Sequence, residues 1–66
     1  MKIIVNGSSE IVNEKSTIYD LIIGKGLNPD KIVVEYNYDI IQSDDYKTVI
    51  LKNNDKLEIL NFVGGG

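Results

Sequence analysis

Residues 17–24 read TIYDLIIG, and this stretch has the spacing of an amphipathic helix. Thr17 is followed three residues later by Asp20, which approximates the capping box that opens many helices, although Ser16 could serve as the cap instead. Apolar side chains at i, i+3 and i+4 form one stripe, made of Ile18, Leu21 and Ile22. The stretch therefore predicts a short helix that covers a sheet.

Strand patterns lie on both sides of this helix. Residues 2–6 are rich in β-branched side chains and end at Asn6-Gly7, a strong hairpin signal. Further strands are predicted near residues 9–13, 32–36, 39–41, 49–52 and 56–62, with a loop or short helical turn over 43–48. Strands before and after a single helix predict an α+β fold, in which a mixed sheet of four to five strands has the helix packed across one face.

The last predicted strand alternates between two faces. Leu57 and Ile59 share one face, while the other carries Glu58, Leu60 and Phe62. If the first pair faces the helix, large apolar side chains lie on the open face beside the chain end. We refer to Leu60, Phe62 and Val63 as the docking patch, because such a surface suits a partner protein. The alternative is that loops cover these side chains, or that they are scattered surface residues.

The chain ends in three residues without side chains, Gly64, Gly65 and Gly66. A terminal carboxylate on such a chain is slim and unhindered, so it can be threaded into the active site of another protein and activated there. We therefore predict a domain over residues 1–62 and a flexible glycine tail over 63–66, with Gly66 as the residue that is modified covalently. The alternative is a frayed terminus or a remnant of cloning.

Composition narrows the class of protein. The 66 residues predict one small domain, and the absence of His and Cys removes the commonest acid–base group, the thiol nucleophile and the usual zinc ligands. We therefore expect a protein that is not an enzyme. The net charge of −3 and the lack of arginine argue against nucleic acid and favour partners with basic surfaces. No apolar run is long enough for a signal peptide or a membrane span, so we expect a cytoplasmic protein that does not bind membranes.

Several segments together resemble a known family. They are residues 1–6, 17–21, 36–37, 55–59 and 62–66, and their order and spacing resemble those of the ubiquitin-like (β-grasp) sulfur carriers, above all the ThiS-type carriers of thiamin biosynthesis. The departures lie mostly in the middle of the chain. Tyr38 stands where the family usually has a turn glycine, and Gln42, Ser43 and Tyr46 replace a usual Pro-Arg and Trp.

The resemblance implies a mechanism in which the carrier performs no catalysis and binds no cofactor. A ThiF-like adenylating enzyme of the ubiquitin-activating class would use ATP and Mg²⁺ to adenylate Gly66. A sulfur donor, such as a persulfide from a cysteine desulfurase, would then give a thiocarboxylate, and a thiazole synthase would take the sulfur. The alternatives are the small subunit of molybdopterin synthase, a ubiquitin-like protein modifier and a plain interaction module.

Overall fold

The computed structural model describes residues 1–62 and contains five strands and one α-helix in this part of the chain. The strands are β1 (Lys2–Val5), β2 (Ser8–Ile11), β3 (Ile32–Tyr36), β4 (Asp39–Ile41) and β5 (Lys56–Asn61). The α-helix is α1 (Ile18–Gly24), and two short 3₁₀ turns, η1 (Pro29–Lys31) and η2 (Ser43–Asp45), flank the β3–β4 hairpin. The predicted α+β fold is confirmed, although β2 and β5 are shorter than expected.

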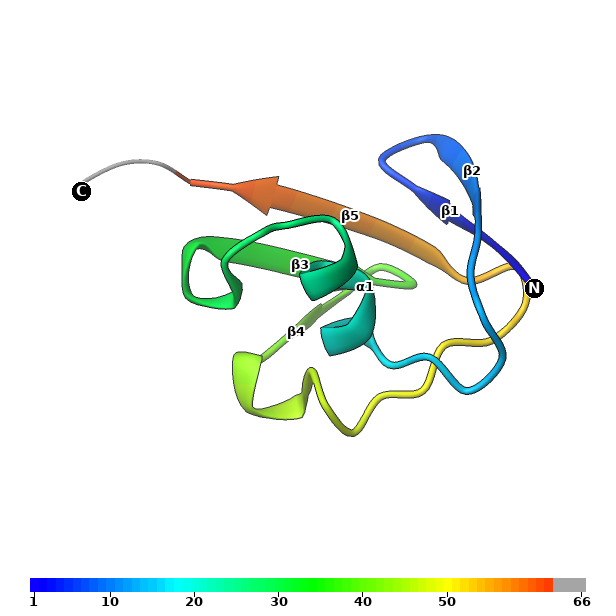
Figure 1. The fold of residues 1–66 in the computed structure, drawn as a ribbon. Coiled ribbons are helices and arrows are strands. Elements are labelled where there is room, and N and C mark those ends of the chain that lie inside the picture. The colour runs from blue at the N-terminus through cyan, green and yellow to red at the C-terminus, as the bar shows by residue number, and fades with distance from the viewer. Residues whose placement is uncertain (63–66) are drawn as a thin grey trace.

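All five strands form one sheet in the order β2-β1-β5-β3-β4 (Figure 1). The central strand β5 runs parallel to β1 and antiparallel to β3, which makes the sheet mixed. The strands nearest the two chain ends therefore lie side by side, and the chain reaches its last described residues from the middle of the sheet. Among residues 1–62, no helix has the length and apolar character needed to cross a membrane.

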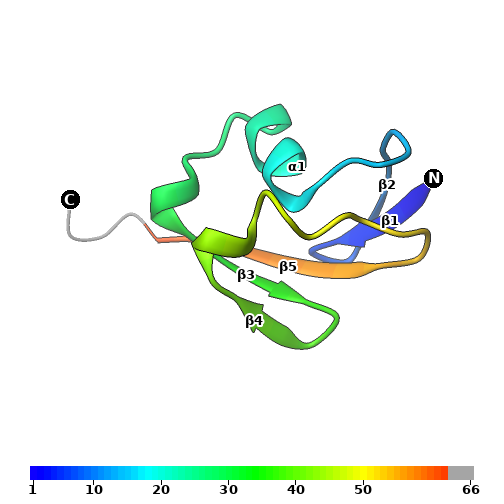
Figure 2. The ribbon, with the colours of Figure 1, turned by 90° about the horizontal axis from the view of Figure 1, so that it is seen from below.

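Helix α1 begins and ends where its sequence predicts. The Thr17 hydroxyl accepts from the backbone N–H of Asp20 at 3.1 Å, and the Asp20 carboxylate accepts from the N–H of Thr17 at 3.0 Å, so Thr17 and not Ser16 is the cap. Gly26, just after the helix, has a φ of 74°, which favours glycine. Figure 2 shows α1 on one face of the sheet and no helix on the other face of the described part.

The core lies between α1 and the sheet. The three apolar residues of the helix stripe are buried, and so are Leu57 and Ile59, which confirms the predicted inward face of the last strand. Buried partners come from β1 and β3: Ile3, Val5, Ile32 and Val34. Such a core, rather than any disulfide, holds this cysteine-free chain together.

The strand predicted near residues 49–52 is wrong. This segment makes only an isolated bridge between Thr17 and Ile50. Its backbone bonds to the residues that lead into α1, since the Leu51 N–H donates to the Ser16 carbonyl at 2.8 Å. The segment therefore packs against the start of α1, where Leu51 and the preceding Tyr46 are buried, and does not add a strand to the sheet.

The β3–β4 turn tolerates the unusual Tyr38. Asn37 and Tyr38 have φ values of 47° and 77°, so both occupy the left-handed region that a tight hairpin turn needs. The Asn37 side chain fixes the turn, because its Oδ1 accepts from the Lys56 N–H at 2.9 Å. The ring of Tyr38 lies 5.0 Å from the Lys56 ammonium, a cation–π contact that offsets part of the strain.

Candidate functional site

Residues 59–62, which lead into the C-terminal tail and which we call the tail root, are held by hydrogen bonds on both sides of β5. On the β3 side, Ile32 pairs with Asn61, and the Phe62 N–H donates to the Lys31 carbonyl at 3.0 Å. On the β1 side, the Asn6 side chain holds Ile59 by two hydrogen bonds, accepting from its N–H at 2.7 Å and donating to its carbonyl at 3.1 Å. The Asn6 amide thus continues the strand pairing past the point where the β1 backbone turns away.

The described part of the docking patch is exposed. Leu60 is 67% exposed and Phe62 is 51% exposed, on the strand end that leads to residue 63. Val63 and the tail residues Gly64, Gly65 and Gly66 lie outside the described residues. The roles of the patch in docking and of Gly66 in covalent attachment therefore stay predictions.

Leu60 and Phe62 line two different recesses on this side of the molecule. Leu60 lines a groove of about 210 Å³ on the open sheet face, together with Val33, Glu35, Ile40 and Glu58. Phe62 lines a recess of about 280 Å³ whose other walls come from η1, the β3–β4 hairpin and the start of η2. Val33 and Ile40 belong to both, so the two hollows adjoin each other next to the tail root and share these apolar side chains.

A buried carboxylate stabilises the loop before β5. Asp55 is only 7% exposed and accepts three hydrogen bonds: from the Tyr36 hydroxyl at 2.7 Å, the Asn37 amide at 3.1 Å and the Lys52 N–H at 2.7 Å. Burial, and then the hydrogen bond to Asp55 and its charge, raise the pKa of Tyr36 to about 12. The hydrogen bonds of these groups are made to one another, so we assign these groups a structural role.

The sequence interpretation missed Asn6, Lys31 and Asp55 as groups that position the tail root and the loop before it. From the sequence, Asn6 is assigned only to a hairpin turn and to the resemblance, and Asp55 only to the resemblance. A signal was present for Asn6, because Asn-Gly turns place the asparagine side chain next to neighbouring backbone. There was none for Lys31, which acts through its carbonyl alone.

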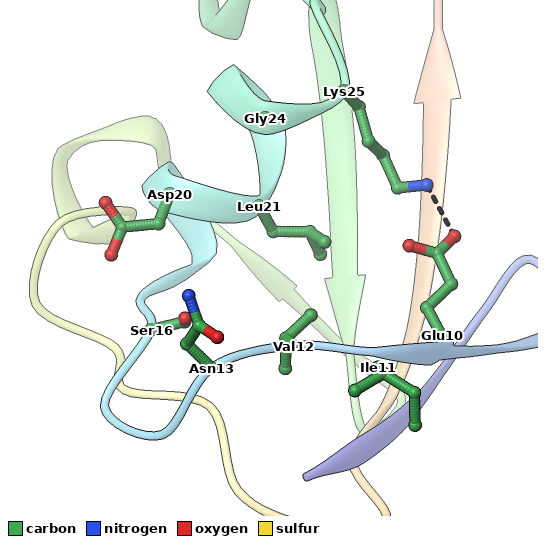
Figure 3. A pocket seen from close by; sticks show the side chains of 9 residues that line it. All are labelled: Glu10, Ile11, Val12, Asn13, Ser16, Asp20, Leu21, Gly24 and Lys25. Atoms are coloured by element: carbon green, nitrogen blue, oxygen red, sulfur yellow. Dashed lines mark hydrogen bonds and ion pairs between the residues drawn. The ribbon is translucent and has the colours of Figure 1, made fainter.

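A further recess lies at the other side of α1, between the helix and the segment that follows β2, with a volume of about 330 Å³ (Figure 3). Val12 and Leu21 form its apolar floor, and the Lys25 ammonium bonds the Glu10 carboxylate at 2.5 Å along one wall. None of its lining residues belongs to β5. This recess is therefore distinct from the site at the tail root. Within residues 1–62, no three His, Cys, Asp or Glu side chains are grouped so that they could hold a metal ion.

Comparison with known proteins gives consistent matches. The sequence profile of the ThiS family matches residues 2–66. The sulfur carrier protein ThiS of Bacillus subtilis is 40% identical over 53 residues, which cover 80% of each chain. A thiazole synthase of Magnetococcus marinus is 35% identical over 66 residues, and this chain spans only 20% of the length of that relative. A crystal structure of a thiamine biosynthesis protein (ThiS) from Geobacter metallireducens matches over 100% of both chains, with a TM-score of 0.85 and 26% identity.

These matches agree with the geometry described above. The close structural similarity confirms the β-grasp fold that the sequence resemblance implied. The family match extends over the whole of β5, the docking patch and the three terminal glycines. The chain belongs to the ThiS family.

Proposed function

We propose that this chain is a sulfur carrier of thiamin biosynthesis, and that the carboxylate of Gly66 is the group that becomes adenylated and then thiolated. The observation that carries the proposal is the family match, which includes the terminal glycines and runs to residue 66. The name of the Bacillus subtilis relative, a sulfur carrier protein, supports the same role.

The chemistry requires an activating partner. A carboxylate oxygen of Gly66 attacks the α-phosphorus of ATP and pyrophosphate leaves, which gives an acyl-adenylate. The terminal sulfur of a donor persulfide then attacks the acyl carbon and AMP leaves. A thiol then attacks the cysteine sulfur of the donor in the resulting acyl disulfide. The transferred sulfur leaves with the acyl group as the thiocarboxylate, and the donor cysteine and the thiol are left joined in a disulfide. The adenylating enzyme must supply Mg²⁺ and basic groups, because two anions have to meet.

The role of this chain is to present the carboxylate. Phe62 is fixed to Lys31, so the folded domain can dock beside the partner's active site while the residues after it enter. Four extended residues reach about 13 Å, which is enough to cross a narrow entrance. Glycine at positions 64–66 leaves the carbonyl carbon open to both ATP and the sulfur nucleophile.

The receiving partner that we propose is a thiazole synthase. A protein of that name from Magnetococcus marinus contains, within its longer chain, a region 35% identical to this whole chain. A carrier domain and a sulfur-accepting enzyme that share one polypeptide would work on each other at high effective concentration. We infer that this chain serves the same type of enzyme.

Intact-mass analysis tests the proposal. The chain is incubated with ATP, Mg²⁺, a candidate adenylating enzyme and a sulfide or persulfide source, and we expect a mass gain that corresponds to one oxygen replaced by sulfur. The chain lacking Gly66 is the control and should show no gain. Conjugates on lysines of other proteins would instead indicate a ubiquitin-like modifier. Sulfur transfer to a molybdopterin precursor, with none to a thiazole synthase, would contradict the assignment to thiamin biosynthesis.

A further inference from the structure

The open sheet face carries two carboxylates directly opposite each other. Glu35 of β3 and Glu58 of β5 are cross-strand partners in the register, and both are half-buried. In the next row of the same face, Val33 of β3 is the partner of Leu60. Like charges placed opposite each other on neighbouring strands destabilise a sheet. The fold therefore tolerates a local electrostatic cost in the same groove as the apolar side chains of Val33, Ile40 and Leu60.

No cation within residues 1–62 forms an ion pair with either carboxylate. Neither Glu35 nor Glu58 has a positively charged atom within ion-pair distance in the described part, where the ion pairs are Met1–Glu14 and Lys25–Glu10. Lys56 lines a neighbouring hollow of about 230 Å³ together with Glu35, Tyr38 and Glu58, but its ammonium lies over the Tyr38 ring at 5.0 Å and bonds the Tyr38 hydroxyl at 3.3 Å. The two carboxylates thus present their charge to whatever covers the face.

We propose that Glu35 and Glu58 together bind one arginine side chain of the adenylating enzyme, while apolar side chains of that enzyme fill the groove of Val33, Ile40 and Leu60. This inference rests on the proposed function and names the chemistry of the partner's docking surface. A guanidinium is planar and has five donors, so it can bridge two neighbouring carboxylates, and its aliphatic stem suits an apolar wall. A compact ammonium matches this geometry less well.

Two features of the chain favour a basic partner at this face. The chain has a net charge of −3, so a partner with a positive surface is attracted before contact. The groove also adjoins the tail root, because Leu60 of β5 lies two residues before Phe62. A single enzyme can therefore hold the face and receive the glycine carboxylate at the same time.

The test compares two pairs of charge-removing changes in the full chain. One variant carries Glu35→Gln and Glu58→Gln, and the matched control carries Glu14→Gln and Asp44→Asn, which remove the same charge elsewhere. Affinity for the adenylating enzyme is measured by calorimetry at low and high salt. We expect the first variant to bind about tenfold more weakly at low salt, with a smaller salt dependence. The control should stay within about twofold of the wild type.

Thermal unfolding provides the second measurement. Because the first variant loses a repulsion, its melting temperature should equal or exceed that of the wild type. Unchanged affinity of the first variant would overturn the inference, and so would weaker binding together with a lower melting temperature. In either case, normal adenylation of the wild type would leave the proposed function intact. Failure of every enzyme to adenylate the wild type would contradict the proposed function and this inference with it.

Discussion

The hydroxyl of Tyr36 donates a hydrogen bond of 2.7 Å to the buried carboxylate of Asp55. Burial, this bond and the carboxylate charge all favour the neutral phenol, and they raise the pKa of Tyr36 from 10.0 to about 12. The folded state thus binds this proton more tightly than the unfolded state. The stability that the shift contributes is complete below pH 10 and is lost as the pH rises towards 12.

Alkaline titration checks this relationship. The tyrosinate absorbance of the wild type should include one group that ionises near pH 12, and Tyr36→Phe should remove it. Asp55→Asn should lower the pKa of Tyr36, because it removes the negative charge, although burial keeps part of the shift. An unaltered high-pH phase in Tyr36→Phe would show that the phase belongs to another tyrosine, such as Tyr46, whose pKa burial also raises.

Removal of the Asp55 carboxylate should destabilise the protein strongly. Asp55→Ala leaves the Tyr36 hydroxyl, the Asn37 amide and the Lys52 N–H without their acceptor in a mostly buried place. We expect a loss of about 3 kcal/mol in the free energy of unfolding, measured with urea. Asp44→Ala, at an exposed acid, should change it by less than about 0.5 kcal/mol. Equal effects of the two changes would contradict the structural role of Asp55.

The Asn6 side chain should stabilise the tail root by holding β5. Asn6→Gly removes both hydrogen bonds to Ile59 and keeps a residue that accepts the φ of 50°. We expect a loss of about 1–2 kcal/mol and faster hydrogen exchange at the Ile59 amide. Asn54→Gly is the matched control, since Asn54 has a similar φ of 73° and its side chain makes no hydrogen bond in the described part. If hydrogen exchange at the Ile59 amide is as slow in Asn6→Gly as in the wild type, Asn6 does not hold β5 in this way.

Short sequence patterns correctly predicted the features that depend on residues close together in the chain. The Thr17 capping box uses residues three apart, and the alternation of Leu57 and Ile59 follows from strand geometry, so both could be read in the sequence. The segment near Ile50 has the apolar pattern of a strand, but its buried Leu51 packs near the start of α1 and its backbone forms only one bridge, to Thr17. That contact joins parts of the chain more than thirty residues apart.

The remaining features depend on distant partners. Asn6 lies 53 residues from Ile59, and Asp55 lies 19 residues from Tyr36, so no spacing rule connects them. The Glu35–Glu58 pair likewise exists only through the register of β3 and β5. The sequence could suggest that Leu60 is exposed beside Glu58, whereas the position of Glu35 and the groove required the folded structure.

Leu60 should contribute to partner binding and little to stability. Leu60→Asp places a charge on a side chain that is already 67% exposed, so we expect the melting temperature to change by only a few degrees. Binding to the adenylating enzyme should weaken at least about tenfold, because the change puts a carboxylate into an apolar contact beside two others. Ile11→Asp is the control, since Ile11 is 80% exposed but lies on the edge strand β2. A collapse of the melting temperature in Leu60→Asp would show that this side chain supports the core.

The terminal glycines should matter for chemistry and not for folding. Deletion of Gly66 removes the carbonyl that we propose as the reacting group, and Gly65→Ala adds a methyl group where the chain enters the partner. A glycine has no side chain to contribute to a core, so the melting temperature should stay within a few degrees of the wild type. The rate of adenylation, measured as pyrophosphate release, should fall to zero in the deletion variant and drop at least about tenfold in Gly65→Ala. Chains extended by one alanine after Gly66 provide the control for length. Wild-type rates of pyrophosphate release from the deletion variant would show that Gly66 is not the activated residue, because its carboxylate would then be dispensable.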